Sequence, residues 1–239
     1  MNTKDERVKN INSKKSVFWE LFFPKYCSSE WIPLINLYKR NQSFKVGERI
    51  FNEGDVMDGV YLLISGKAKV VSRYDKNNER ILRLAAEGKI LGHRAMAHPN
   101  FTVSAVALTE CTTIFIPIEI FLKLIKANPE FGMFMINFFA TELHESEERM
   151  KNMIHHDVKL RVADIIIMLV DAFGYHETEK TKLSFTLCRK DIANIAGTTY
   201  ETAIRSLFQL QEMNLIELDK KTILVKKEAE LRELASQKS

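Results

Sequence analysis

The chain has 239 residues, of which 46% are hydrophobic, and carries a formal net charge of +4 at pH 7. This length and composition suit one large domain or two modest ones with sizeable cores. No apolar run approaches the roughly 20 residues that span a bilayer, and the charged N-terminus leads into no signal-type core. We therefore expect a cytoplasmic protein that contacts no membrane. Its three scattered cysteines fit a reducing compartment and make no zinc or iron–sulfur motif, so we expect no metal and no cofactor.

The first strongly patterned segment covers residues 44–67. Short runs rich in Val, Ile, Tyr and Phe are separated there by Gly47, Gly54 and Gly66. This pattern is typical of antiparallel strands joined by tight turns. Ahead of it, residues 17–23 predict an amphipathic helix that packs on the strands, and the basic stretch 4–15 predicts disorder.

A long helix is predicted over residues 128–155, because no Gly or Pro interrupts the stretch after Gly132. Its apolar side chains recur at spacings of three and four, as in a coiled-coil seam. The predicted dimer-interface residues are Ile136, Phe139, Leu143, Ser146, Met150 and Met153. A lone amphipathic helix packed on its own domain would give a similar pattern. The charges on both flanks leave only a narrow stripe, however, which favours a contact between two helices. Those flanking charges are Glu142, Glu145, Glu147, Glu148, Arg149 and Lys151.

A hinge is predicted near residues 155–157, and residues 158–173 predict a further helix that carries the C-terminal part of the chain. Residues 188–207 then have the pattern of a helix-turn-helix. Gly197 can take the left-handed conformation that ends the first helix, and Thr199 can cap the second. Three apolar residues share one face of the first helix, namely Ile192, Ile195 and Ala196.

Two helices joined this tightly cross steeply, so the outer face of the second helix, from residue 200 to about residue 213, projects from the surface. The side chains expected to turn inward and hold that helix are Ile204, Leu207, Phe208 and Leu210. Residues 214–225 predict a two-stranded wing behind it.

Glu201 and Arg205 lie four residues apart on the projecting face. A glutamate can accept a hydrogen bond from cytosine N4, and an arginine can bind guanine O6 and N7 with two hydrogen bonds. A solvated ion pair is the structural alternative, but the surrounding helix-turn-helix favours contact with DNA. Residues 157–239 hold equal numbers of basic and acidic side chains. A segment without net charge can bind DNA if its cations face the same side, as we expect for those near the turn. The predicted DNA-binding residues are Arg189, Lys190, Thr199, Tyr200, Glu201, Thr202 and Arg205.

Taken together, these segments resemble the CRP/FNR family of transcription regulators. The resemblance rests on residues 44–55 and 60–67, which are similar to the opening hairpins of the family's sensor domain, and on the Glu and Arg of the second helix of the pair. It implies an α+β fold with an N-terminal double-stranded, jelly-roll-like β-roll, a long dimerisation helix and a C-terminal winged helix-turn-helix. The expected parts are an N-terminal arm and helix (1–24), a β-roll sensor (25–125), the dimerisation helix (128–155), the winged helix-turn-helix (157–226) and a C-terminal helix or tail (227–239).

The resemblance also locates an effector pocket. Family members that bind cyclic nucleotides carry a Glu after a Gly, for the ribose, and later an Arg before Ser or Thr, for the cyclic phosphate. Here His93 follows Gly92 and Phe101 precedes Thr102. Without that arginine a buried phosphate would lack its counter-charge, so we do not expect cAMP binding. On the long helix, Ser146 keeps one of two family hydroxyls that face the purine, while Glu147 departs from the second.

Several functional alternatives remain open. The pocket residues Gly92, His93, Phe101, Thr102 and Ser146 serve either a different small effector or a vestigial site in an effector-independent regulator. A haem or metal site at His93 and His98 is a third alternative, and a cyclic-nucleotide-type regulatory module without DNA binding is a fourth. No catalytic motif occurs, so we expect no enzyme. The expected partners are double-stranded DNA with an inverted-repeat operator, a second copy of the chain, RNA polymerase and the unidentified effector.

Overall fold

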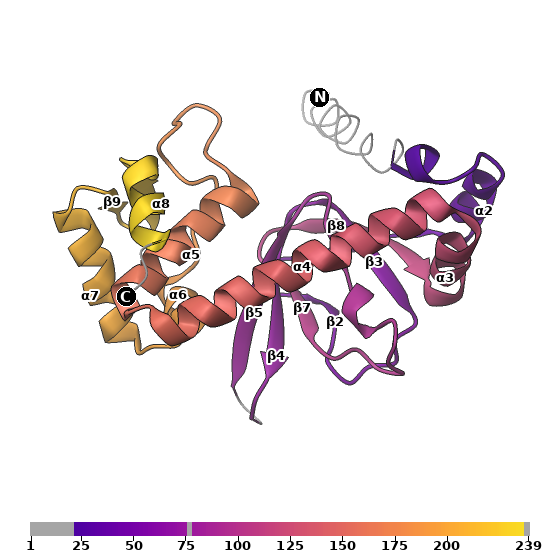
Figure 1. Ribbon diagram of the computed structural model, residues 1–239, viewed down its shortest axis with the longest axis horizontal. Coiled ribbons are helices and arrows are strands. Elements are labelled where there is room, and N and C mark those ends of the chain that lie inside the picture. The colour runs from indigo at the N-terminus through magenta and orange to yellow at the C-terminus, as the bar shows by residue number, and fades with distance from the viewer. Residues whose placement is uncertain (1–21, 76–77, 237–239) are drawn as a thin grey trace, which may run out of the picture. The chain divides into compact units, whose positions relative to one another are not determined.

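The structure, a computed structural model, describes residues 22–75 and 78–236 (Figure 1). The chain divides into two units, of which the first comprises residues up to 79 together with 85–141 and the second comprises 80–84 together with 142–239. The predicted disordered stretch 4–15 and most of the predicted helix 17–23 lie outside the described residues. Within the described ranges, no helix is both long and apolar enough to cross a membrane.

The N-terminal half of the chain forms two four-stranded antiparallel sheets, with strand orders β1-β8-β3-β6 and β2-β7-β4-β5, and all of these strands except residues 80–84 of β5 belong to the first unit. This confirms the β-roll predicted from the glycine-punctuated runs. Gly66 joins β3 to β4 in a left-handed conformation, and a Cβ there would lie 2.3 Å from the carbonyl oxygen of Glu110, so only glycine fits this turn. The strands are β1 (Arg40–Phe44), β2 (Arg49–Phe51), β3 (Gly59–Ser65), β4 (Lys67–Arg73), β5 (Glu79–Ala86), β6 (Ile90–Leu91), β7 (Ser104–Ala107) and β8 (Cys111–Pro117).

Aromatic rings fill much of the core of this unit. Helices α2 (Trp31–Tyr38) and α3 (Ile118–Ala127) belong to it, and Phe121 and Phe131 are fully buried. Phe22 and Phe23, the described residues of the predicted N-terminal helix, are buried with ring centroids 6.0 and 6.2 Å from that of Phe131. Close ring pairs of this kind stabilise a core beyond the area that they bury.

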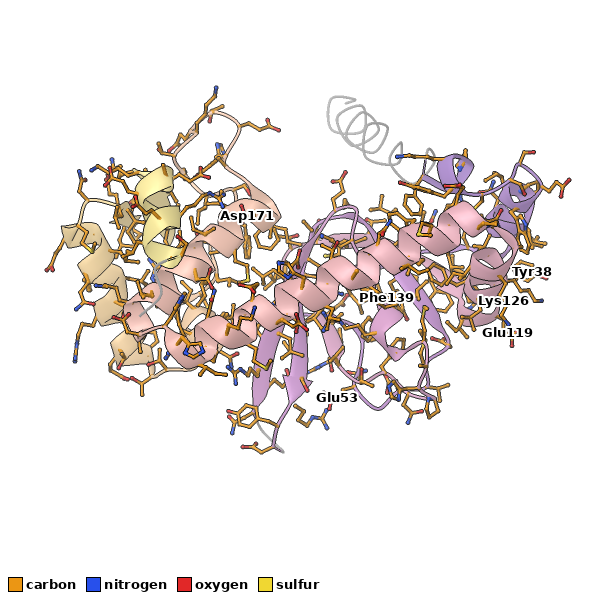
Figure 2. All side chains as sticks on the ribbon, in the orientation of Figure 1. Tyr38, Glu53, Glu119, Lys126, Phe139 and Asp171 are labelled. Atoms are coloured by element: carbon orange, nitrogen blue, oxygen red, sulfur yellow. The ribbon has the colours of Figure 1, made fainter. Side chains whose placement is uncertain are left out.

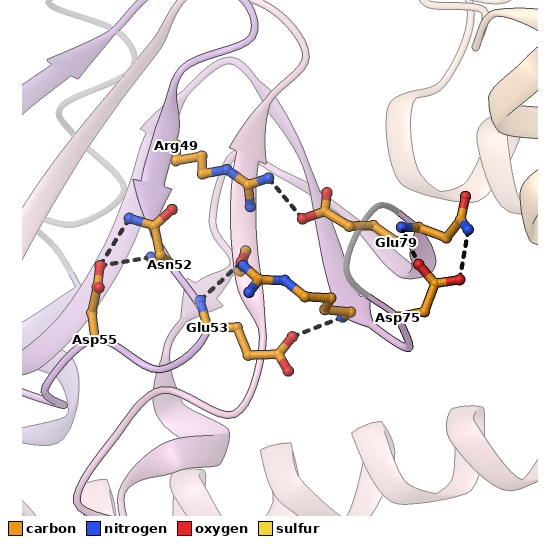
Figure 3. A network of polar contacts seen from close by, with 9 residues as sticks. Arg49, Asn52, Glu53, Asp55, Asp75 and Glu79 are labelled. Carbon is orange, nitrogen blue, oxygen red and sulfur yellow. Dashed lines mark hydrogen bonds and ion pairs between the residues drawn. The ribbon is translucent and has the colours of Figure 1, made fainter.

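A surface network of polar contacts holds the turns beside β2 and β4 (Figure 3). The carboxylate of Glu53 accepts a hydrogen bond from the backbone N–H of Arg73 at 2.8 Å, and Arg49 pairs with Glu79 at 2.7 Å. The carboxylate of Asp55 accepts from the side-chain amide of Asn52 at 2.8 Å. These side chains are partly exposed, so each pair stabilises the unit only slightly.

The long helix α4 runs from Pro129 to His155 (Figure 1). It begins one residue after the predicted start because Asn128 caps the preceding helix α3 instead. The buried side chain of Asn128 donates to the carbonyl oxygen of Leu124 at 3.0 Å and accepts from the backbone N–H of Ser28 at 2.9 Å. Pro129 suits the first helical position, where a backbone donor is not needed.

The second unit is a winged helix-turn-helix, as predicted. Its elements are α5 (Val158–Phe173), α6 (Arg189–Ala196), α7 (Tyr200–Glu212), β9 (Ile216–Asp219), β10 (Thr222–Val225) and α8 (Glu228–Ser236). The side chain of Asp157 caps α5 by accepting from the backbone N–H of Leu160 at 2.9 Å. Arg232 of α8 donates to Asp171 of α5 at 2.6 Å, and Figure 2 labels Asp171. The core holds fully buried Ile166, Leu169 and Ile192.

Candidate functional site

The turn between α6 and α7 has the predicted capping contacts. Gly197 is left-handed, with a φ of 59°, and the backbone N–H of Thr198 donates back to the carbonyl oxygen of Ala193 at 3.1 Å. The hydroxyl of Thr199 accepts from the backbone N–H of Thr202 at 3.2 Å, which starts α7. Arg161 of α5 also donates to the carbonyl oxygen of Ala196 at 2.8 Å. The direction of α7 is therefore fixed by hydrogen bonds at both sides of the turn.

The outward face of α7 carries Glu201 and Arg205, both exposed as predicted. Neither side chain forms a hydrogen bond or an ion pair within the described part of the chain. The structure therefore does not contain the alternative ion pair between Glu201 and Arg205. Their charged ends are free for a partner. The opposite face of α7 is buried through Ala203, Leu207 and Leu210.

One prediction for α7 is wrong: Phe208 does not turn inward but is 52% exposed. A helix advances about 100° per residue, so position 208 lies beside positions 201 and 205 and away from the buried face. Helical register, rather than the apolar character of the ring, decides its direction. Ile204, by contrast, is half-buried.

The basic residues before α7 differ in exposure. Arg189 opens α6 half-buried, and desolvation lowers the pKa of its guanidinium, with Tyr200 acting in the opposite direction. One terminal nitrogen of Arg189 is buried and has no hydrogen-bond partner among the described residues. Lys190 is exposed, as is Tyr200 at the start of α7. The hydroxyls of Thr199 and Thr202 lie 3.0 Å apart.

The wing adds two cations that we did not predict as functional. Lys220 and Lys221 form the exposed turn between β9 and β10, and Lys220 is left-handed, with a φ of 51°. A pair of lysines at the tip of a predicted hairpin was the signal in the sequence that could have found them. Both are candidates for phosphate contacts.

An apolar stripe runs along α4 with no cover from the described chain. Ile136, Leu143 and Met150 are each 61% exposed and recur at intervals of seven residues. Ile154, which we did not predict, is also exposed and extends the stripe. We call these four residues the α4 stripe.

The other predicted interface residues lie differently. The ring of Phe139 packs on that of His93, with 5.4 Å between centroids, and Figure 2 labels Phe139 on α4. Ser146 is half-buried, and the sulfur of Met153 lies 3.2 Å from the position of a Cβ on Gly197. Glu142, expected as a solvated flank, is 6% exposed and forms a buried ion pair with Arg83 of β5. Charge alone did not reveal that partner, because it comes from a distant strand.

The predicted pocket residues in the first unit are mostly part of its core. Phe101 is 3% exposed and stacks on Phe51, with 4.2 Å between ring centroids. Gly92 lies against this ring, because a Cβ on Gly92 would be 2.9 Å from it. Thr102 faces solvent instead, and Ser146 belongs to the second unit. At the position where the resemblance predicts a cation for a cyclic phosphate, the structure holds an aromatic stack.

The neighbourhood of His93 is equally apolar. Its ring is 1% exposed and packs edge to face on Phe138, with 4.8 Å between centroids. His98 is exposed. No group of three or more His, Cys, Asp or Glu side chains suited to a metal ion occurs in ranges 22–75 and 78–236.

Tyr61 of β3 is also part of this core. Burial, together with the charges of Asp58 and Asp55, raises the pKa of Tyr61 to about 12.

Two family models match the chain. A cyclic nucleotide-binding domain matches residues 41–128, and a Crp-like helix-turn-helix domain matches residues 160–234. The chain is 26% identical over 208 residues to a global nitrogen regulator of Nostoc sp., covering 86% of this chain and 91% of that relative. It is also 26% identical over 183 residues to a CRP-like cAMP-activated global transcriptional regulator of Mycobacterium tuberculosis, covering 76% of this chain and 82% of the relative.

Solved structures agree on the fold. FixK2 from Bradyrhizobium japonicum superposes with a TM-score of 0.75 at 18% identity, covering 84% of this chain and 99% of that one. A transcriptional regulator of Thermus thermophilus superposes with a TM-score of 0.68 at 21% identity, covering 84% of this chain and 100% of the other. These relatives are regulators of transcription and not enzymes.

Proposed function

We propose, from the premise that this chain belongs to the CRP/FNR family of transcription regulators and carries its DNA-binding helix-turn-helix, that it binds an inverted-repeat operator as a homodimer. We further propose that a small effector other than cAMP gates this binding. Arg205 and Glu201 read base edges, while Arg189, Lys190 and the wing lysines contact phosphates.

The observation that carries the proposal is the pair of unpartnered charges on α7. Glu201 and Arg205 are exposed on the face opposite the buried side of the helix, and neither has a partner in the described residues. An arginine with a free guanidinium matches the two acceptors of guanine, and the adjacent carboxylate matches the amino group of cytosine. Thr199 and Thr202 stand at the N-terminus of α7, where backbone and hydroxyl donors suit a phosphate.

The α4 stripe supports the homodimer. Its members Ile136, Leu143 and Met150 keep the seven-residue interval that a two-helix seam requires, and they remain exposed in the single chain. Exposed apolar side chains in a continuous line along one helix mark an interface. A two-fold copy of the same helix covers such a line with an identical one. Two recognition helices presented in this way read half-sites about 34 Å apart.

The pocket residues support an effector other than cAMP. A relative from Mycobacterium tuberculosis is described as cAMP-activated. In this chain, however, Phe101 replaces the arginine expected for the cyclic phosphate, and its ring is stacked on Phe51. An ionised phosphate next to two rings would lose its hydration without gaining a counter-charge. The same stack favours the second candidate, an effector-independent regulator whose pocket is vestigial.

The DNA proposal is tested by selecting bound fragments from a random duplex pool with the full chain. The selected sites are expected to form an inverted repeat. Arg205→Ala then weakens binding by ~1–3 kcal/mol per half-site and relaxes one base pair, because it removes the guanine contact. Lys190→Ala serves as the matched control, and it weakens all sequences alike and reduces the salt dependence. Unchanged binding of Arg205→Ala to the selected site would show that α7 does not read the bases.

The effector proposal is tested by thermal unfolding of the full chain with candidate ligands. A ligand that binds only the folded protein raises the unfolding temperature with its concentration. We expect no rise with cAMP and a rise with at least one fraction of a metabolite extract. A rise with cAMP would contradict the proposal, and no rise with any fraction would favour the effector-independent regulator.

A further inference from the structure

Phe208 is a large apolar side chain that the fold of the second unit does not use. It is 52% exposed although it lies near the middle of α7, and its ring makes no ring–ring contact with any residue the structure describes. The core of this unit is formed on the other side of α7, where Leu207 and Leu210 are fully buried. Leu210 lies about 160° around the helix from Phe208, so no small adjustment of α7 would bury the ring in that core.

The position of Phe208 along α7 places it with the base-reading side chains. Glu201, Arg205 and Phe208 fall within about 60° of one another around the helix axis. Phe208 lies about 4.5 Å beyond Arg205 and about 10 Å beyond Glu201 along that axis. A recognition helix lies in the major groove, so side chains that share its outer face are directed toward the same groove. This places the ring of Phe208 within reach of a base pair close to the one proposed for Arg205.

Only one chemical group in the major groove suits an aromatic ring that donates and accepts no hydrogen bond. Guanine, cytosine and adenine present polar edges there, whereas thymine presents its 5-methyl group. A phenyl ring brought against the polar edges would dehydrate them without replacing their hydrogen bonds. Against the methyl group, both partners lose apolar surface to water, which is favourable.

We propose that Phe208 packs on the 5-methyl group of a thymine in each half-site, within one or two base pairs of the guanine bound by Arg205, and that it sets a thymine requirement there. This inference rests on the proposed DNA-binding function. It adds to that function an apolar reader next to the charged pair. The partner that covers this exposed ring is therefore duplex DNA and not a protein.

The test removes one methyl group at a time from the operator. Each thymine of the selected half-site is replaced by deoxyuridine, which keeps the hydrogen-bonding edges and removes only the methyl group. For the unchanged protein we expect one position per half-site at which the loss of the methyl group weakens binding about fourfold through Phe208, the effect of one buried methyl-sized group. Phe208→Ala should bind the thymine site more weakly, and deoxyuridine at that position should then cause no further loss. Phe208→Leu, which keeps an apolar side chain, should retain part of the effect.

Two controls separate the outcomes. Met213→Ala truncates another exposed apolar side chain at the end of α7, off the reading face, and should bind as the unchanged protein does. Thermal unfolding of Phe208→Ala should match that of the unchanged protein, because the ring is exposed. If Phe208→Ala keeps every methyl effect, or weakens all sequences equally, the inference is overturned. Arg205→Ala decides the underlying proposal separately, since its loss of guanine preference does not depend on Phe208.

Discussion

The outer face of α7 and the segment from Gly92 to Phe101 differ in how far their side chains are exposed to solvent. On α7, Glu201 and Arg205 are exposed and unpartnered in the described chain. In the loop, His93 and Phe101 are almost fully buried among other rings. The sequence predicted contacts to another molecule in both regions. In α7 the predicted side chains are exposed, whereas in the loop His93 and Phe101 belong to the core.

This difference shows how a binding position can be lost or kept. A side chain that makes no contact within its own fold can be replaced at little cost in stability, so its identity is set by its partner. A buried ring is set by its neighbours, because the interior is close-packed and a change in volume must be accommodated. Phe101 thus stabilises the sheet domain whether or not a ligand binds. The charges of α7 make no such contribution within the described chain.

The largest expected effect comes from separating the two protomers, because DNA binding by two copies of α7 depends on the dimer. Met150→Glu places like charges against each other across the proposed seam, so the dimer should dissociate. Linked binding commonly exceeds single-site binding by ~10²–10⁴-fold, and DNA affinity should fall on this scale. Sedimentation and DNA titration measure the two effects. Thr141→Glu, an exposed position on the far side of α4, is the control and should remain dimeric. A DNA-competent dimer of Met150→Glu would contradict the seam.

The second expected effect is on stability, which should fall when the buried Phe101 is truncated but not when the exposed Arg205 is. Phe101→Ala should destabilise the sheet domain by ~3–5 kcal/mol, because it removes a buried ring and leaves a cavity. Arg205→Ala should change stability by less than ~0.5 kcal/mol, since its side chain is exposed. Urea unfolding followed by tryptophan fluorescence reports this domain, because Trp31 lies in α2. Equal stability of the two variants would show that the Phe51–Phe101 stack is not part of the core.

The smallest expected effect concerns Tyr200. Its ring can contact a thymine methyl group or a sugar, but it cannot bind a guanine with two hydrogen bonds. Tyr200→Arg should therefore add a guanine preference of ~1–3 kcal/mol at one position and leave the preference that depends on Arg205 in place. Selection of bound fragments measures both, with Tyr200→Phe as control. Identical selected sites for the unchanged protein and Tyr200→Arg would mean that Tyr200 only packs at the helix start.

The features of the structure that the sequence predicted depend on residues close together in the chain. Gly197 and Thr199 signal the end of α6 and the start of α7 through their own backbone and hydroxyl preferences, and both act as predicted. Short strands separated by Gly47, Gly54 and Gly66 likewise predicted the sheets, because turn chemistry is local.

The errors concern side chains whose surroundings come from elsewhere. Glu142 looked like a solvated flank, but Arg83 of β5 pairs with it in a buried position. Phe208 is an error of another kind, because the helical register that exposes it is local and could have been derived from the sequence. The stacking of Phe101 on Phe51 joins residues 50 positions apart, so no local pattern indicated it. Burial is a property of the assembled sheets and helices, and polarity along the chain predicts it only in part.

Arg161 has a consequence for the electrostatics of the helix ends. Its guanidinium donates both to the carbonyl oxygen of His156, just past the end of α4, and to that of Ala196, the last residue of α6. The C-terminus of a helix carries a partial negative charge. The guanidinium of Arg161 therefore offsets the partial charges at the ends of both α4 and α6. One side chain therefore ties the last residue of α6 to the residue that follows α4.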